Sequence, residues 1–391
     1  MNEALKQRFY SCFGRAAEMV VSAPGRTELC GNHTDHQGGC VLAAAVDLDM
    51  KAAAARNGSG FLRVQSEGYP FCEIGLDEPE IRASEIGTTA ALVRGVMAGF
   101  LRHGKKPSGM DIYVTSEVMP GSGLSSSAAF EVLIGAVLNE SLPDGRFSAQ
   151  ELARLGQYAE NVYFGKPCGL MDQTASAVGG ILAIDFADTA SPRIEKIPFD
   201  FSAGDYSICI LSCGADHSDL TDEYAAITRE LGAVSAFFGR SRLREVEEAA
   251  FRAKIPELRK LAGDRAVLRA MHVFAENRRV QACKEALYDG NMERFLRVIR
   301  ESGDSSWRFL QNIIPTGAAA HQEMAIALAT AEHALSGKGT CRVHGGGFAG
   351  TVQAFVRNEE VPGFRAQTEA ILGSGSCRVL TVRQTGAVRL E

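Results

Sequence analysis

The chain lacks the features that mark secreted and membrane proteins. Its ten cysteines form no CxxC pair, and no stretch approaches the roughly 18 uninterrupted apolar residues of a membrane span. The first residues, MNEALKQRFYSCFGRAAEMVV, carry charges where a signal peptide requires an apolar core. These absences predict a cytoplasmic protein with reduced thiols and no association with membranes.

An excess of positive charge is also lacking. The 391 residues carry a formal net charge of -6, so the overall field does not attract DNA or RNA, and no nucleic-acid partner is expected. Hydrophobic residues make up 46% of the chain and charged residues 23%, which is typical of a globular protein with a large interior. The length exceeds one ordinary domain and suits two packed lobes with a cleft between them.

Strands and helices are mixed without a regular βαβ alternation, which predicts an α+β fold. Strands are expected over 19–22, 40–54, 61–65, 71–74, 111–115, 180–186, 206–212, 350–356 and 378–382, and around Arg342. Helices are expected over 2–17, 88–102, 149–164, 222–299 and 318–335, and a polar loop over 26–39. The segment 189–192, TASP, is the best linker candidate, which predicts lobes of residues 1–190 and 191–391.

The segment VMPGSGLSSSAAFEVLIGAV, residues 118–137, has the pattern of a phosphate cradle. A glycine turn leads into serines where a helix is expected to begin, and the free N–H groups at such a helix start attract anions. The alternative interpretation is a turn followed by a serine N-cap, which is common. The segment is neither a Walker loop, because GK[ST] is missing, nor a GxGxxG dinucleotide fingerprint.

A second motif, APGRTELCGNHTDHQGG at residues 23–39, concentrates hydrogen-bonding side chains in one loop. Its histidines and aspartate suggest a zinc site, but the HTDH spacing supplies at most three crowded ligands, so metal is the weaker interpretation. Mixed donors and acceptors suit a polyhydroxylated ligand better. A third motif, HGGGFAGTVQAFV at residues 344–356, lets either a ligand or a neighbouring strand approach the backbone, and taken alone it favours strand packing.

Together the three motifs, in this order, are similar to those of the GHMP kinases. The loop at residues 23–39 and PCGLMDQ at residues 167–173 closely resemble the galactokinase branch, and SDLTDEYAAITREL at residues 218–231 also fits. The resemblance extends over essentially the whole chain. It implies an α+β, two-lobed GHMP-kinase-like fold with the active site in the cleft between the lobes.

The resemblance also implies a galactokinase, which uses ATP and Mg²⁺ to phosphorylate the anomeric C1 hydroxyl of D-galactose to galactose 1-phosphate. The expected partners are a small-molecule sugar and ATP, and a monomer is expected. Asp172 and Arg26 match the family's catalytic pair, and a carboxylate with a guanidinium suits phosphoryl transfer. Outside this motif Asp172 reads as a helix N-cap.

The remaining site residues follow from the same resemblance. Magnesium is expected at Ser127 and Glu160, although Glu160 equally fits a surface position on a helix. The residues expected to bind the sugar are His33, Asp35, Gly169, Tyr224, Asn32 and Glu28. The residues expected to bind ATP are Pro120, Gly121, Ser122, Gly123, Leu124, Ser125, Ser126 and Ser127. Gly345, Gly346 and Gly347 are expected at the site as the glycines of the third motif.

Two of these positions depart from the family pattern. The family has a glutamate where this chain has Asn32 and an asparagine where it has Glu28, as if acid and amide had changed places. An amide near C6 of the sugar tolerates a carboxylate there, and plant galacturonate kinases have a similar DHQGG run, so galacturonate is an alternative substrate. A non-catalytic sugar sensor is less expected because Asp172, Arg26 and the serine run are intact. A mevalonate or homoserine kinase is less expected because those branches lack the HTD loop.

Overall fold

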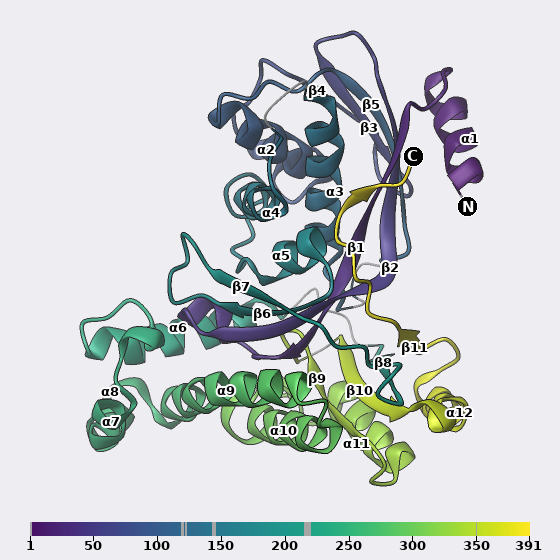
Figure 1. Cartoon of the computed structure of the whole chain (residues 1–391). Coiled ribbons are helices and arrows are strands. Elements are labelled where there is room, and N and C mark those ends of the chain that lie inside the picture. Colours follow the sequence, from purple (N-terminus) through teal and green to yellow (C-terminus); the bar gives the residue numbers. More distant parts are fainter. Residues whose placement is uncertain (1, 119–120, 122, 143–145, 215–219, 349) are drawn as a thin grey trace.

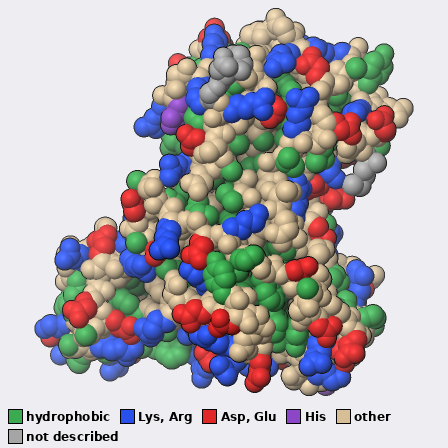
Figure 2. Space-filling model, in the orientation of Figure 1, with side chains coloured by type: hydrophobic (Ala, Val, Ile, Leu, Met, Phe, Trp, Pro, Cys, Tyr) green, Lys and Arg blue, Asp and Glu red, His purple; other side chains and the backbone are tan. Residues whose placement is uncertain are grey.

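A computed structural model describes the whole chain except residues 1, 119–120, 122, 143–145, 215–219 and 349. Figure 1 shows two lobes, each with a sheet and packed helices. This mixed arrangement confirms the predicted α+β class. On the face in Figure 2, acidic and basic side chains are interspersed over both lobes.

The first sheet, counted over the described residues, has eight strands in the order β12-β1-β2-β5-β3-β4, with β6 paired to β2 and β7 to β6. The β3–β5 pair is parallel and the others are antiparallel. The central strands β1 and β2 are buried along most of their length, which fits their alanine- and valine-rich sequences. The bounds are β1 (Met19–Cys30), β2 (Cys40–Arg56), β3 (Phe61–Ser66), β4 (Cys72–Gly75), β5 (Met110–Ser116), β6 (Ile181–Asp185), β7 (Arg193–Ile197) and β12 (Val388–Arg389).

Helices cover both faces of this sheet (Figure 1). One face packs against α2 (Thr89–Arg102), α3 (Ser126–Ser141), α4 (Ala149–Tyr158) and α5 (Met171–Val178), and the other against α1 (Asn2–Phe13). Nearly every residue of α3 is buried, so α3 is the central helix of the lobe. The α4 helix starts with a Ser148–Glu151 capping box and continues into a π-helical segment, η3 (Ala159–Phe164).

The second sheet has, over the described residues, four antiparallel strands in the order β11-β8-β10-β9. Buried residues of β8, β10, α9 and α10 join the hydrophobic cluster of the first sheet, so the lobes share one continuous core. The strands are β8 (Tyr206–Ser212), β9 (Thr340–His344), β10 (Thr351–Arg357) and β11 (Cys377–Leu380). The helices are α6 (Thr221–Phe237), α7 (Glu248–Ala253), α8 (Ile255–Ala262), α9 (Asp264–Tyr288), α10 (Met292–Ser305), α11 (Glu323–Leu335) and α12 (Val361–Leu372). Short segments are η1 (Asp35–Gln37), η2 (Ala83–Glu85), η4 (Leu243–Glu245), η5 (Ser306–Leu310) and η6 (Asn358–Glu360).

Several predicted elements were wrong in extent. The first helix ends at Phe13, and the segment 222–299 is divided among α6 to α10. The loop expected from residue 26 is still strand as far as Cys30, because β1 remains paired with β2 there. The helices α5 and α12 and the strand β7 were not predicted. Because β7 belongs to the first sheet, the chain changes sheet between β7 and β8, and the division into residues 1–190 and 191–391 stays a prediction.

Candidate active site

The motif at residues 23–39 and the third motif, at residues 344–356, meet at the seam between the two sheets. His344 at the end of β9 lies against β1, where its Nε2 accepts the Glu28 N–H at 3.2 Å and contacts the Thr27 hydroxyl at 3.0 Å. Nδ1 therefore carries the hydrogen and donates to Thr351 Oγ1 at 2.9 Å. Burial, together with the nearby Arg26 and Arg342, lowers the pKa of His344 well below its ordinary value. The imidazole is therefore neutral and ties the two motifs together.

Arg26 and Asp172 form a two-point ion pair. Arg26 Nε donates to Asp172 Oδ1 at 2.7 Å and Nη2 donates to Oδ2 at 2.9 Å, while the Ser125 hydroxyl donates to Oδ2. Burial alone would raise the pKa of Asp172, but Arg26 and Ser125 hold it below the ordinary value. Asp172 lies in the first turn of α5, and its side chain is 29% exposed. It is therefore an ionised carboxylate that still reaches solvent.

Asp35 lies beside this pair and explains Gly169. A Cβ on Gly169 would lie 1.9 Å from Asp35 Oδ2, so only glycine fits there. Burial raises the pKa of Asp35, and the nearby charge of Asp172 adds to that effect. Two carboxylates thus share one region, and Asp35 binds its proton more tightly than an exposed aspartate does.

The helix α3 begins next to Asp172 with an open N-terminus. Ser125 precedes the helix in the left-handed conformation, with φ of 57°, and makes no side-chain cap. The first-turn N–H groups are thus free of a side-chain cap and suit an anion. Gly123, also at positive φ, fits because a Cβ there would lie 2.2 Å from Thr351 Oγ1. Pro120 and Ser122, both predicted here, lie outside the described residues.

Ser127 in this first turn donates to Glu160 Oε1 at 2.8 Å. The same oxygen accepts from Lys166 Nζ at 3.1 Å, and Oε2 accepts from Gln173 Nε2 at 2.9 Å. Glu160 is buried in the π-helical segment η3, and such segments are frequent at functional sites. The expected pair of metal ligands is thus brought together, whereas Lys166 and Gln173 were missed although both lie in or beside the PCGLMDQ motif.

A cavity of about 390 Å³ opens beside Ser126 and Ser127. Its walls are mostly apolar and are contributed by β2, β5, α2, α3 and the segment after β3. A flat aromatic base fits such a pocket, because apolar walls with a few polar groups are typical of small-molecule sites. Its main apolar lining residues are Met50, Tyr69, Leu92, Val118, Phe130 and Phe164.

His33 and Tyr224 approach the triple glycine from opposite lobes. His33, at a φ of 58°, contacts the Gly346 carbonyl through Nε2 at 2.9 Å, and the Tyr224 hydroxyl donates to the Gly347 carbonyl at 2.9 Å. A Cβ on Gly346 would lie 2.5 Å from the Tyr224 ring, and one on Gly347 would lie 2.1 Å from the Asn312 carbonyl. The third motif thus serves packing, as its sequence alone favoured, and its turn from Gly345 to Gly347 also brings predicted sugar-site residues together.

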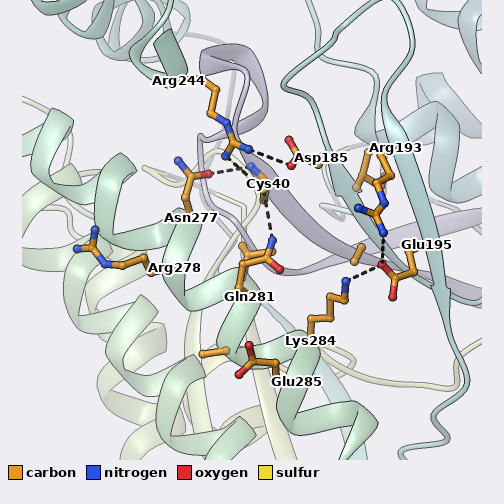
Figure 3. Close-up of a pocket in the computed structure, with 14 residues that line it drawn as sticks. Cys40, Asp185, Arg193, Glu195, Arg244, Asn277, Arg278, Gln281, Lys284 and Glu285 are labelled. Atoms are coloured by element: carbon orange, nitrogen blue, oxygen red, sulfur yellow. Dashed lines mark hydrogen bonds and ion pairs between the residues drawn. The ribbon is translucent and has the colours of Figure 1, made fainter. Parts of the chain in front are cut away.

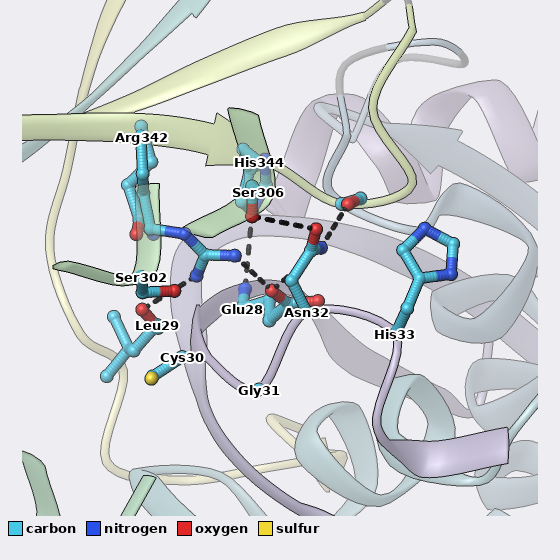
Figure 4. A network of polar contacts seen from close by, with 12 residues as sticks. Glu28, Leu29, Cys30, Gly31, Asn32, His33, Ser302, Ser306, Arg342 and His344 are labelled. Atoms are coloured by element: carbon cyan, nitrogen blue, oxygen red, sulfur yellow. Dashed lines mark hydrogen bonds and ion pairs between the residues drawn. The ribbon is translucent and has the colours of Figure 1, made fainter. Parts of the chain in front are cut away.

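Glu28 and Asn32 lie in a sealed network (Figure 4). Arg342 of β9 donates to Glu28 Oε1 at 2.6 Å and to the Leu29 carbonyl at 2.8 Å. Asn32 Nδ2 donates to the Gly345 carbonyl at 2.6 Å and to Glu28 Oε1 at 3.2 Å. Asn32 is fully buried, and its Oδ1 accepts from Asn312 Nδ2 at 2.8 Å. Glu28 Oε1 and both polar side-chain atoms of Asn32 are therefore engaged by protein groups.

The helix α9 holds the backbone of the same loop. Glu276 Oε1 accepts the Gly31 N–H at 3.1 Å, and His272 Nε2 donates to the Asn32 carbonyl at 3.0 Å. Burial lowers the pKa of His272 to about 4, so its ring is neutral. Burial alone would raise the pKa of Glu276, but the charges of Arg279 and Arg342 and the Ser302 hydroxyl hold it far below the ordinary value. These residues could not be identified from the sequence, because they lie more than 200 positions from the loop.

Another cavity, of about 590 Å³, lies elsewhere, between α9 and the β6–β7 pair (Figure 3). Two ion pairs lie within its lining: Arg244 binds Asp185 at 3.0 Å and Lys284 binds Glu195 at 2.5 Å. It contains none of the motif residues and is not the candidate active site. Within the described part of the chain, no cluster of three or more His, Cys, Asp or Glu side chains is arranged to bind a metal, and no helix has the length and apolarity to cross a membrane.

Comparisons with known proteins agree with this geometry. Residues 91–180 match the family model "GHMP kinases N terminal domain", and residues 7–56 match the "Galactokinase galactose-binding signature". The galactokinase of Glaesserella parasuis serovar 5 is 33% identical over 93% of this chain and 91% of its own length. That of Streptomyces coelicolor is 32% identical over 93% and 90%.

Two solved structures illustrate the fold. Lactococcus lactis galactokinase, crystallised with galactose, superposes with a TM-score of 0.84 at 27% identity and covers all of both chains. A mevalonate kinase superposes with a TM-score of 0.65 at 15% identity, over 94% of this chain and all of its own, which supports the fold alone.

Proposed function

The chain belongs to the galactokinase family of the GHMP kinases, and we propose that it transfers the terminal phosphoryl group of ATP to the anomeric C1 hydroxyl of D-galactose. It is an ATP-dependent sugar kinase of that family. The observation that carries the proposal is the position of Asp172, an ionised and partly exposed carboxylate held by Arg26 and Ser125 at the start of α3. A base, a cation and an anion-binding helix start are the groups that phosphoryl transfer requires.

In the proposed reaction the C1 hydroxyl gives its proton to Asp172 while its oxygen bonds to the γ-phosphorus. The bond from that phosphorus to the bridging oxygen breaks, and ADP leaves with the electron pair. Arg26 steadies the charge on the transferring group. Because the pKa of Asp172 is low, its proton passes on to water, for which the 29% exposure of the side chain leaves a path.

We place the adenine in the apolar cavity beside Ser126 and the phosphates over the first turn of α3. We assign Mg²⁺ to Ser127 and Glu160. One hydroxyl and one carboxylate within 2.8 Å of each other suit an ion that also takes phosphate and water ligands, and the bound ion would neutralise phosphate charge. The chain is proposed to act as a monomer in the cytoplasm, where its ten unpaired thiols would stay reduced.

We assign the sugar to the space near His33, Asp35, Gly169 and Tyr224. Galacturonate is the second candidate substrate, because Asn32 brings no charge that would repel a C6 carboxylate. Against it, Asn32 is already bonded to Gly345 and Asn312, so its amide is not free to bind that carboxylate.

A coupled assay of ADP formation with galactose, galacturonate, N-acetylgalactosamine and arabinose tests the proposal. Galactose should give the highest kcat/KM. If galacturonate alone stimulated ADP formation, the substrate would be wrong while the sugar kinase would stand. If none of these sugars stimulated ADP formation, the non-catalytic sensor interpretation would be favoured.

A further inference from the structure

Lys166 lies beside the carboxylate that we assign to the metal. Its Nζ is 3.1 Å from Glu160 Oε1, the oxygen that also accepts the Ser127 hydroxyl. The Lys166 side chain is 62% exposed, whereas that of Glu160 is 3% exposed. The flexible, solvent-exposed ammonium of Lys166 thus forms an ion pair with the buried carboxylate of Glu160.

The side chains around Glu160 include several acids and few cations that could bind the phosphates of a nucleotide. Asp35, Asp172 and Glu160 supply acidic groups, while Arg26 is already engaged by both oxygens of Asp172. Burial raises the pKa of Glu131, which accepts a hydrogen bond from Gln173, well above its ordinary value. A triphosphate placed over α3 meets one arginine that is already paired, and phosphoryl transfer depends on neutralising the equatorial oxygens.

We propose that Lys166 is a second phosphate-binding cation, held on Glu160 in the nucleotide-free protein and transferred to phosphate oxygens when nucleotide binds. The inference rests on the proposed function. Lys166 cannot keep its contact with Oε1 once that oxygen serves as a metal ligand, because two cations on one oxygen repel each other.

A purely structural role of Lys166 and the proposed exchange of partners predict opposite changes in the Mg²⁺ requirement when Lys166 is removed. If Lys166 only held the Glu160 side chain in position, its removal would disorder Glu160 as a metal ligand, and more Mg²⁺ would be needed for half-saturation. If Lys166 exchanges partners, its removal frees Glu160 from a competing cation, and less Mg²⁺ would be needed while nucleotide binds more weakly.

The test uses Lys166→Met, which keeps the length of the side chain, and Lys166→Arg, which keeps the charge. The matched control is Lys254→Met, which removes a lysine paired with Glu257 at 2.8 Å on the surface. Calorimetry with a non-hydrolysable ATP analogue at saturating Mg²⁺ measures nucleotide affinity without sugar or turnover. A Mg²⁺ titration of the same binding gives the half-saturation point.

Lys166→Met should weaken analogue binding by about 10- to 100-fold, the range of a hydrogen bond to a charged group. It should also lower the Mg²⁺ half-saturation point, while Lys166→Arg and Lys254→Met bind within about threefold of wild type on the same scale. Unchanged analogue affinity in Lys166→Met, or a raised Mg²⁺ requirement, would overturn the proposal. Because no sugar is present, failure of the galactose assignment leaves this result interpretable.

Discussion

Two arginine–carboxylate pairs begin two residues apart on β1 and differ mainly in exposure. In the Arg26–Asp172 pair the nitrogen and oxygen are 2.7 Å apart, and the side chains are 8% and 29% exposed. In the Arg342–Glu28 pair the distance is 2.6 Å, and the side chains are 0% and 5% exposed. The first pair faces α3 and can accept a ligand, whereas the second joins β1 to β9 and has no room for one. Similar groups at similar distances thus serve chemistry in one place and lobe attachment in the other.

The comparison predicts that the partly exposed Arg26–Asp172 pair, the open pair, controls the rate of turnover. Asp172→Asn should lower kcat by about 10³-fold, because proton acceptance by a positioned base contributes about 10²- to 10⁴-fold. Thermal unfolding should change little, since the carboxylate is partly solvated. Asp185→Asn is the matched control, because Asp185 pairs with Arg244 at 3.0 Å and its side chain is 31% exposed. Turnover of Asp172→Asn within tenfold of wild type would break the comparison.

The buried Arg342–Glu28 pair, the sealed pair, should instead control the stability of the fold. Glu28→Gln leaves Arg342 buried without a counter-charge and should reduce the free energy of unfolding by about 3 kcal/mol. The folded fraction should keep most of its kcat. Urea denaturation measures the loss, and the double variant Glu28→Leu with Arg342→Met should recover part of it, because it removes both charges together. A large loss of kcat in folded Glu28→Gln, without a loss of stability, would contradict the assignment.

Lowering the pH should reduce the free energy of unfolding, through the buried histidines, before it protonates Asp172 of the open pair. Burial lowers the pKa of His36 to about 3 and that of His272 to about 4, and also lowers that of His344. The unfolded chain takes up these protons from about pH 6.5 and the folded chain does not, so stability is full above pH 6.5. It should then fall towards pH 4 by about 1.4 kcal/mol per pH unit for each histidine.

Urea denaturation between pH 7.5 and 4.5 measures this slope. His272→Gln should be less stable at pH 7.5 and show a shallower slope than wild type. Asp172, whose pKa is lowered, stays ionised through the window, so kcat of the folded protein should hold. An equal slope in both proteins would show that His272 remains titratable in the folded state.

The smallest effect is expected at the proposed metal ligand. Ser127→Ala removes one hydroxyl among several oxygen ligands and should raise the Mg²⁺ half-saturation point by about tenfold, or about 1.4 kcal/mol. At saturating Mg²⁺ kcat should stay close to wild type. Steady-state assays over a Mg²⁺ series measure both values, with the exposed Ser11→Ala as control. An unchanged half-saturation point would remove Ser127 from the metal site.

The open region could be predicted from the sequence because its parts are local. The serine run does start α3. Asp172 lies in the first turn of α5, a helix that was not predicted, and the N-cap of that helix is Leu170, so the alternative of Asp172 as an N-cap was wrong. Each of these features depends on turn and helix chemistry within a few residues. The resemblance to the family assigns roles to residues within such short motifs. The site residues could therefore be named from the sequence before their geometry was known.

The sealed region could not be predicted, for a physical reason. Glu28 and Arg342 are 314 positions apart. The second half of β1, residues 26–30, was predicted to be a polar loop because its buried polar groups are paired with the other lobe. Thr27, for example, accepts from Gln353 at 2.6 Å and contacts His344. Only the assembled lobes satisfy these groups, so local polarity suggested exposure where the chain is in fact buried.

The site of phosphorylation on the sugar tests the central claim most directly. Phosphorus-31 NMR, correlated with sugar protons, should be recorded on a reaction of the protein with ATP, Mg²⁺ and D-galactose, beside a reaction with Asp172→Asn. The account predicts a new phosphate signal coupled to the anomeric proton with wild type and almost none with the variant. A phosphate coupled to the C6 protons, or an equal yield from the variant, would contradict it.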